Sequence, residues 1–227
     1  MRITKMKQNI NFLILLSLLF NNSLGNAQTE STTGFIPNGY VLFEEYSADV
    51  NEDGLEDCIL IIKNSKEENI IENRFGDVVD RNRRGIIVLL GTENGYESIL
   101  KNLDCFSSEN ENGGVYYPPE LSIDIHKNIL KIHYGHGRYG NWEYIFRYDE
   151  SDFKLIGYES SENRGPIVNY KTSINFLTKK KQVLENENMN SQDKEEVFKE
   201  TWEKIKIENL IKLSEIQDFD EIDMNKY

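Results

Sequence analysis

The sequence has little positive charge and, beyond residue 20, no long apolar run. Lysine and arginine number 26 against 39 aspartates and glutamates, so the formal net charge is −13 at pH 7. Such an acidic surface repels nucleic acids and anionic membranes, so we expect no nucleic-acid partner. The same surface tolerates bound cations well.

Cysteine is also scarce: the chain holds only Cys58 and Cys105. In an oxidising compartment two cysteines allow one disulfide. Two buried free thiols in strands are the alternative. The spacing along the chain does not decide between them, because the distance between the two residues does.

Motifs of the common enzyme classes are missing. The chain has no G-x-S-x-G, no phosphate-binding loop and no H-E-x-x-H, and its G-x-G-x-x-G pattern, "GHGRYG" at 135–140, leads into a strand-like segment instead of opening a helix. Carboxylates are abundant, but no two stand out as an acid–base pair. The sequence therefore favours a role other than catalysis, and an extracellular hydrolase is the alternative function.

The amino terminus has the pattern of a signal peptide. Basic residues precede the apolar run "FLILLSLLF" at 12–20, and the small residue Ala27 follows. The run is short for a membrane anchor, which is the alternative, and no cysteine follows it for lipid attachment. Cleavage after Ala27 would remove three basic residues, leaving 23 against 39 acids, a net charge of −16. We expect a secreted or periplasmic protein without a membrane anchor.

Beyond residue 27 the chain reads as short strands between turns. A flexible leader is expected at 28–38, a single mainly-β domain at 39–216 and an acidic, fraying tail at 217–227. Strand-like segments occur at 40–46, 58–63, 85–91, 95–102, 120–126, 129–135, 142–149, 153–160, 170–177 and 181–187. Their short connections predict an antiparallel meander that forms a sandwich or a curled, barrel-like or partial propeller-like sheet.

Three segments are less clear. The apolar run 85–91 fits a strand buried on both faces, although a short buried helix has the same pattern. Residues 193–213 fit either a helix or a bulged strand, and the neighbouring strands favour a strand. The charged stretch 64–84 reads as an excursion from the sheet.

The stretch "DVNEDGLED" gathers oxygen-bearing side chains around one glycine. Counted from Asp49, Asp or Asn oxygens occupy positions 1, 3, 5 and 9, with the carbonyl of Leu55 at position 7. Calcium takes six to eight oxygen ligands at about 2.3–2.6 Å, and a tight loop can supply them from alternate residues. Mg²⁺ suits an all-protein cage less well. An EF-hand is excluded, because Leu60 stands where that motif needs a bidentate glutamate.

This D-x-N-x-D-G-x-x-D pattern before a strand resembles the calcium loop of FG-GAP and VCBS-type repeats. The resemblance implies calcium ligands at the positions that match: Asp49, Asn51, Asp53, Leu55 and Asp57. Those families repeat the loop in each propeller blade, whereas here it occurs once. The segments "GVYYPPELSIDI", "HYGHGRYGNWEYIFRY", "FKLIGYESS" and "NYKTSINFLTKK" look like a group of single-domain secreted bacterial proteins without an assigned activity.

The acidic loop and one further stretch each have more than one interpretation. Asp, Asn and Gly are common in solvated turns, which is the alternative for the acidic loop. The stretch "HYGHGRYGNW" holds four residues that suit a partner-binding loop, namely His136, Arg138, Tyr139 and Trp142. The sequence favours the alternative of a glycine-rich hairpin whose aromatics pack on the sheet, and a transition-metal site that also uses His126 and His133 is a third interpretation.

Together these features predict a secreted or periplasmic, calcium-binding β domain with a structural or partner-binding role. The partner would be a protein or a glycan.

Overall fold

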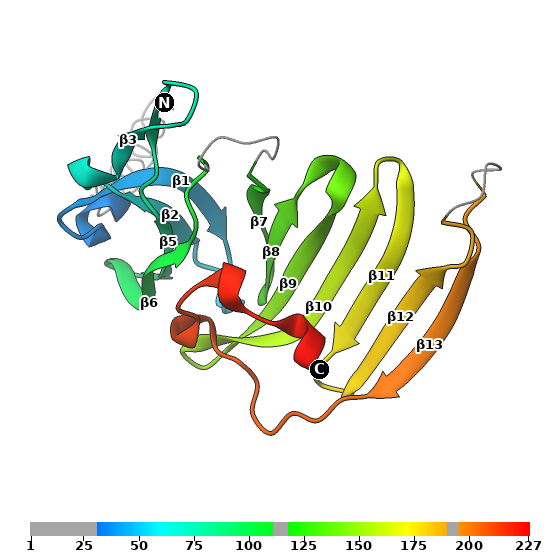
Figure 1. The fold of residues 1–227 in the computed structure, drawn as a ribbon. Coiled ribbons are helices and arrows are strands. Elements are labelled where there is room, and N and C mark those ends of the chain that lie inside the picture. Colours follow the sequence, from blue (N-terminus) through cyan, green and yellow to red (C-terminus); the bar gives the residue numbers. More distant parts are fainter. Residues whose placement is uncertain (1–30, 111–117, 190–194) are drawn as a thin grey trace, which may run out of the picture.

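The computed structural model describes residues 31–110, 118–189 and 195–227. The predicted signal peptide, residues 1–27, lies outside these residues. Within them the chain is mainly β, and its two larger sheets are antiparallel and open (Figure 1), which confirms the predicted fold class. No helix in the described part of the chain is long and apolar enough to cross a bilayer.

The smaller of these two sheets has the strand order β1-β2-β5-β6. Its strands are β1 (Tyr40–Ala48), β2 (Asp57–Asn64), β5 (Arg84–Thr92) and β6 (Gly95–Phe106). Every residue of β2 is buried, as are the first six of β5. The apolar run at 85–91 is thus a strand buried on both faces, because core residues cover each side of the sheet.

The larger sheet is a meander of seven strands in the order β13-β12-β11-β10-β9-β8-β7. Each strand pairs with the next along the chain, and the curved sheet stays open at β7 and β13 (Figure 1). Its strands are β7 (Glu120–His126), β8 (Ile129–Gly135), β9 (Gly140–Asp149), β10 (Asp152–Arg164), β11 (Ile167–Asn175), β12 (Lys180–Asn186) and β13 (Phe198–Lys204). The predicted preference for a strand within 193–213 is confirmed by β13.

The C-terminal segment, residues 207–227, crosses beside both sheets. Its last part, 217–227, was predicted to fray, but buried side chains hold it in place. It carries the short 3-10 helices η4 (Leu213–Glu215), η5 (Phe219–Glu221) and η6 (Met224–Lys226). Phe219 is only 2 % exposed, and its ring packs on aromatic rings of both sheets. Asn102 Nδ2 of β6 donates to the carbonyls of Leu213 and Ile216, each at 2.8 Å. The segment therefore closes the main core between the sheets.

The leader is also more ordered than predicted. Residues 32–35 form the 3-10 helix η1 (Thr32–Phe35), and the side chains of Phe35 and Ile36 pack on the second core of the smaller sheet. Residues 28–30 lie outside the described residues. The leader is held because β2 and β5 present apolar side chains on that outer face.

The charged excursion at 64–84 holds the remaining sheet. The 3-10 helix η2 (Glu67–Asn69) leads into β3 (Ile70–Glu72), which pairs with β4 (Val78–Asp80). Lys63, only 6 % exposed at the end of β2, bonds to Asp80 and Glu109. The excursion is thus anchored to the smaller sheet by a buried charge.

Candidate functional site: the β1–β2 loop

The acidic loop joins β1 to β2 and is folded around its own carboxylates. The two oxygens of Asp49 accept backbone N–H groups from Asp53 and Gly54, both at 3.0 Å. Asn51 accepts from the Asp53 N–H at 3.1 Å, and its amide donates to the Asp53 carboxylate at 2.8 Å. The side-chain oxygens of Asp49, Asn51 and Asp53 are therefore drawn into one small turn.

Backbone conformation explains why this turn has its sequence. Glu52 and Gly54 have positive φ values of 60° and 86°. At the second of these positions glycine, which has no Cβ atom, adopts the positive φ at little cost. The N–H of Leu55 then donates to Asp53 Oδ1 at 2.8 Å.

Asp57 lies at the buried base of the loop. Its side chain is inaccessible to solvent, and its two oxygens accept from the N–H of Val50 at 2.6 Å and of Gly91 at 2.7 Å. Burial raises the pKa of this carboxyl, and the bonds from these amides oppose the rise. Asp57 thereby ties the loop to β5.

Gly91 is required for this contact. A Cβ atom at Gly91 would lie 2.4 Å from the carbonyl oxygen of Glu56, closer than side-chain atoms are tolerated. The absence of a side chain lets the backbone of β5 approach the loop. The buried carboxylate and the glycine together fix how the loop sits on the smaller sheet.

The predicted calcium ligands fit a cation in part. Three oxygen-bearing side chains gather, and each of their carboxylate oxygens has lone-pair capacity beyond the bond it already accepts. Asp57, however, serves two amides, and within the described ranges no group of three His, Cys, Asp or Glu side chains converges as a metal site. Any ion there would therefore depend on the amide oxygen of Asn51 and on the backbone as well.

The electrostatics of the loop leave its charge largely uncompensated. Five acidic residues fall within Asp49–Asp57. The ion pair described for them joins Glu52 to Lys127 at 3.6 Å, and both of these side chains are more than half exposed. An exposed pair of this kind stabilises little. The loop is thus a compact region of negative charge.

The two cysteines form no disulfide, which corrects the possibility raised from the sequence. Both are free and buried. Cys58 belongs to the core on the outer face of the smaller sheet, and Cys105 to the main core on its inner face. Cys58 Sγ bonds to Glu45 Oε1 at 3.1 Å. The sheet itself therefore separates the two thiols.

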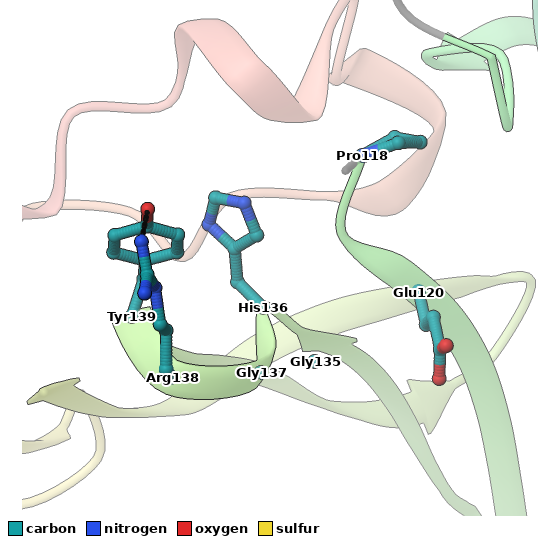
Figure 2. Close-up of a pocket in the computed structure, with 7 residues that line it drawn as sticks. All are labelled: Pro118, Glu120, Gly135, His136, Gly137, Arg138 and Tyr139. Atoms are coloured by element: carbon teal, nitrogen blue, oxygen red, sulfur yellow. Dashed lines mark hydrogen bonds between the residues drawn. The ribbon is translucent and has the colours of Figure 1, made fainter. Parts of the chain in front are cut away.

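The second predicted site is the corner between β8 and β9, which contains the 3-10 helix η3 (Gly137–Tyr139). A cleft of about 620 Å³ opens here. Figure 2 shows the guanidinium of Arg138 beside the ring of Tyr139, with the imidazole of His136 next to that ring. Arg138 donates to the Tyr139 hydroxyl at 2.9 Å, and the centroids of the His136 and Tyr139 rings are 5.1 Å apart.

Trp142, the fourth residue predicted here, faces the core instead. Its ring stacks on that of buried Tyr134, with centroids 5.3 Å apart. The alternative of aromatics packed on the sheet therefore holds for Trp142, while the other three residues line the cleft. His133 Nδ1 lies 3.7 Å from Glu143 Oε2. His126 lies opposite Ile129 at the far end of the β7–β8 hairpin. The three histidines therefore do not form one cluster.

The carboxylates that line the cleft bear on the alternative function, an extracellular hydrolase. Among its described lining residues Glu120 is the one carboxylate, and in Figure 2 it points away from His136. Acid–base catalysis by two carboxylates needs a second one at a suitable separation. Among the described lining residues, no such second carboxylate is present.

Comparisons of the chain with protein-family models, with curated proteins and with solved structures found no match.

Proposed function

We propose that this chain is a secreted or periplasmic β domain that binds Ca²⁺ in the β1–β2 loop. The observation that carries the proposal is the loop itself, where Asp49, Asn51 and Asp53 are held together by backbone amides in a nearly uncompensated acidic turn. The carbonyl of Leu55 and the remaining lone pairs of Asp57 would complete the ligand set. A bound ion would neutralise the clustered charge and fix the turn, which is a structural role.

Affinity is expected to be modest. Both carboxylate oxygens of Asp57 already accept hydrogen bonds from backbone N–H groups, so the ion competes with these bonds. Extracellular modules of this kind bind calcium with dissociation constants on the order of 0.1–1 mM. Such values suit a compartment in which calcium is abundant.

Calorimetric titration with CaCl₂ tests this proposal directly. Asp53→Asn should weaken calcium binding about tenfold or more, because it removes one of the two converging carboxylates. Asp77→Asn is the matched control, since Asp77 also lies in an exposed glycine-containing turn but on the excursion. No binding heat up to about 10 mM calcium, or equal binding by Asp53→Asn, would refute the site.

For the corner at residues 136–139 we propose contact with a protein or glycan partner. The cleft with its arginine, tyrosine and imidazole supports this, because arginine and tyrosine are frequent anchors at interfaces. Binding to a glycan array provides a test in which Tyr139→Ala should lose signal and Tyr170→Ala, at a partly exposed tyrosine of β11, should not. Equal signals from both variants would contradict glycan binding at residues 136–139.

A further inference from the structure

Strand β13 forms an outer edge of the seven-stranded sheet (Figure 1). Within the described residues, β12 is the one strand that pairs with it. All of its side chains are exposed except Phe198, which is partly buried, and Trp202 is 60 % exposed. A regular edge strand of this kind presents a row of backbone groups to another chain.

The hydrogen-bond ladder fixes which residues of β13 face outward. At its two ends, Glu187 N–H donates to Val197 at 2.8 Å and Ile205 N–H donates to Lys179 at 3.1 Å. The register between these bonds has no shift. Because hydrogen-bonded positions alternate in an antiparallel ladder, the odd-numbered residues bond to β12. The even-numbered residues point their N–H and C=O groups outward, namely Phe198, Glu200, Trp202 and Lys204.

We propose that β13 pairs antiparallel with β13 of a second copy of this chain, about a two-fold axis between the two Thr201 residues. Outward-facing residues then bond to outward-facing residues, with Phe198 opposite Lys204 and Glu200 opposite Trp202. Lys199 lies opposite Glu203 of the other copy, and the symmetry makes this pair twice. Two isologous edges of this kind close into a dimer and leave no further edge at β13.

Other registers conflict with the same observations. A shift by one residue places outward groups against inward ones, and it sets Lys199 opposite Lys204 and Glu200 opposite Glu203. An axis through Glu200 puts two carboxylates face to face, which is unfavourable for directly opposite residues. An axis through Trp202 leaves Phe198 and Lys199 without strand partners. The axis at Thr201 pairs the whole strand and opposes no like charges.

Exposed aromatic surface supports the same register. With the axis at Thr201, the two Trp202 side chains are diagonal neighbours on one face of the joined sheet, within reach of each other. This covers part of the 60 % exposed indole. Since a single strand pair is small for an interface, we expect a reversible dimer with a dissociation constant on the order of 10 µM.

A charge exchange tests the pairing by sedimentation equilibrium of the purified protein. Lys199→Glu alone and Glu203→Lys alone should each weaken the dimer about tenfold, because each sets like charges opposite one another twice. The double variant Lys199→Glu with Glu203→Lys should restore it. Both side chains are exposed, and thermal melts of each variant establish that it is folded.

A cysteine cross-link tests the position of the axis. Thr201→Cys should form an intermolecular disulfide under mild oxidation, because non-hydrogen-bonded opposite residues lie about 4.5 Å apart at Cα. Lys199→Cys, displaced from the axis, should not. A wild-type protein that stays monomeric at about 200 µM overturns the proposal. A dimer that ignores the charge exchange, or that cross-links equally at both positions, also overturns it.

Discussion

Asp57 is the residue on which the position of the β1–β2 loop depends. It is fully buried, and its carboxylate joins the N–H of Val50 to the N–H of Gly91 on another strand. A buried carboxylate is costly unless it is hydrogen-bonded, and here two amides satisfy it. The contact between the loop and the smaller sheet therefore rests on one side chain.

Replacing Asp57 by alanine should lower the free energy of unfolding by about 2–4 kcal/mol, because two buried N–H groups lose their acceptor. Urea denaturation in EGTA measures this loss separately from any effect of calcium. Asp53→Ala is the control and should cost about 1 kcal/mol or less, since its bonds are exposed. An Asp57→Ala protein within about 0.5 kcal/mol of wild type would contradict this role.

The cysteines give a second prediction for single residues. Burial raises the pKa of the Cys58 and Cys105 thiols, so neither forms the reactive thiolate readily. A thiol reagent should label neither in the native protein and both after denaturation without reductant. A denatured chain with no reactive thiol would show that a disulfide exists, against the separation of the two residues by the smaller sheet.

Whole elements depend on the periodicity of their apolar residues. Hairpins such as 120–126 with 129–135 were predictable because apolar and polar residues alternate along them, and the structure has the same bounds. The C-terminal segment was missed, although it too has a period. Apolar residues recur there at every third position: Ile207, Leu210, Leu213, Ile216, Phe219 and Ile222.

A period of three fits neither an α-helix nor a strand, and the acidic residues between these positions suggested a solvated tail. Successive 3-10 turns place residues three apart on the same side, so the period of three was a signal for this segment.

The sequence also could not show that the acidic loop fits a calcium ion only in part. Spacing places Asp57 among the ligands, but only the fold shows that its oxygens are already bonded.

Phe219 tests the importance of the C-terminal segment. Phe219→Ala should lower the free energy of unfolding by about 3–5 kcal/mol, because it removes a buried ring between the two sheets. Phe75→Ala, at a position 65 % exposed, is the matched control and should change it by less than about 0.5 kcal/mol. A loss from Phe219→Ala as small as the one expected for Phe75→Ala would mean that the segment contributes little to the fold.

The charged excursion makes stability depend on pH. Burial opposes ionisation of Asp80, but hydrogen bonds from Lys63 and Asn82 outweigh it and lower its pKa. A lowered pKa in the folded state contributes stability above the unfolded value, about 4, that is lost as pH falls through the folded one. The stabilisation is therefore complete at pH 7.

Asp80→Asn should thus cost stability at pH 7 and progressively less below pH 4. Asp80 is 39 % exposed, so solvent screening keeps the effect to about 1 kcal/mol or less. Urea denaturation at several pH values measures it, with Asp77→Asn as the control for removing one charge. A deficit that persists unchanged at low pH would contradict a stabilising contact between Lys63 and Asp80.

At the scale of the whole molecule, the main electrostatic feature is the excess of acidic residues, which the composition already shows. The net charge of −13 is spread over the chain, but the β1–β2 loop concentrates five acids in nine residues. Self-repulsion of this kind destabilises a compact state, and a bound divalent cation relieves it locally. Calcium is therefore expected to stabilise the entire fold through this one loop.

Thermal unfolding in EGTA and in 10 mM CaCl₂, at matched ionic strength, tests this central claim most directly. With a dissociation constant near 1 mM, binding adds about 1.4 kcal/mol, which corresponds to a rise in Tm of about 3–5 °C for a chain of this size. Asp53→Asn should lose the rise and Asp77→Asn should keep it. Superimposable melts of the wild-type protein, or an equal rise in Asp53→Asn, would contradict calcium binding in the loop.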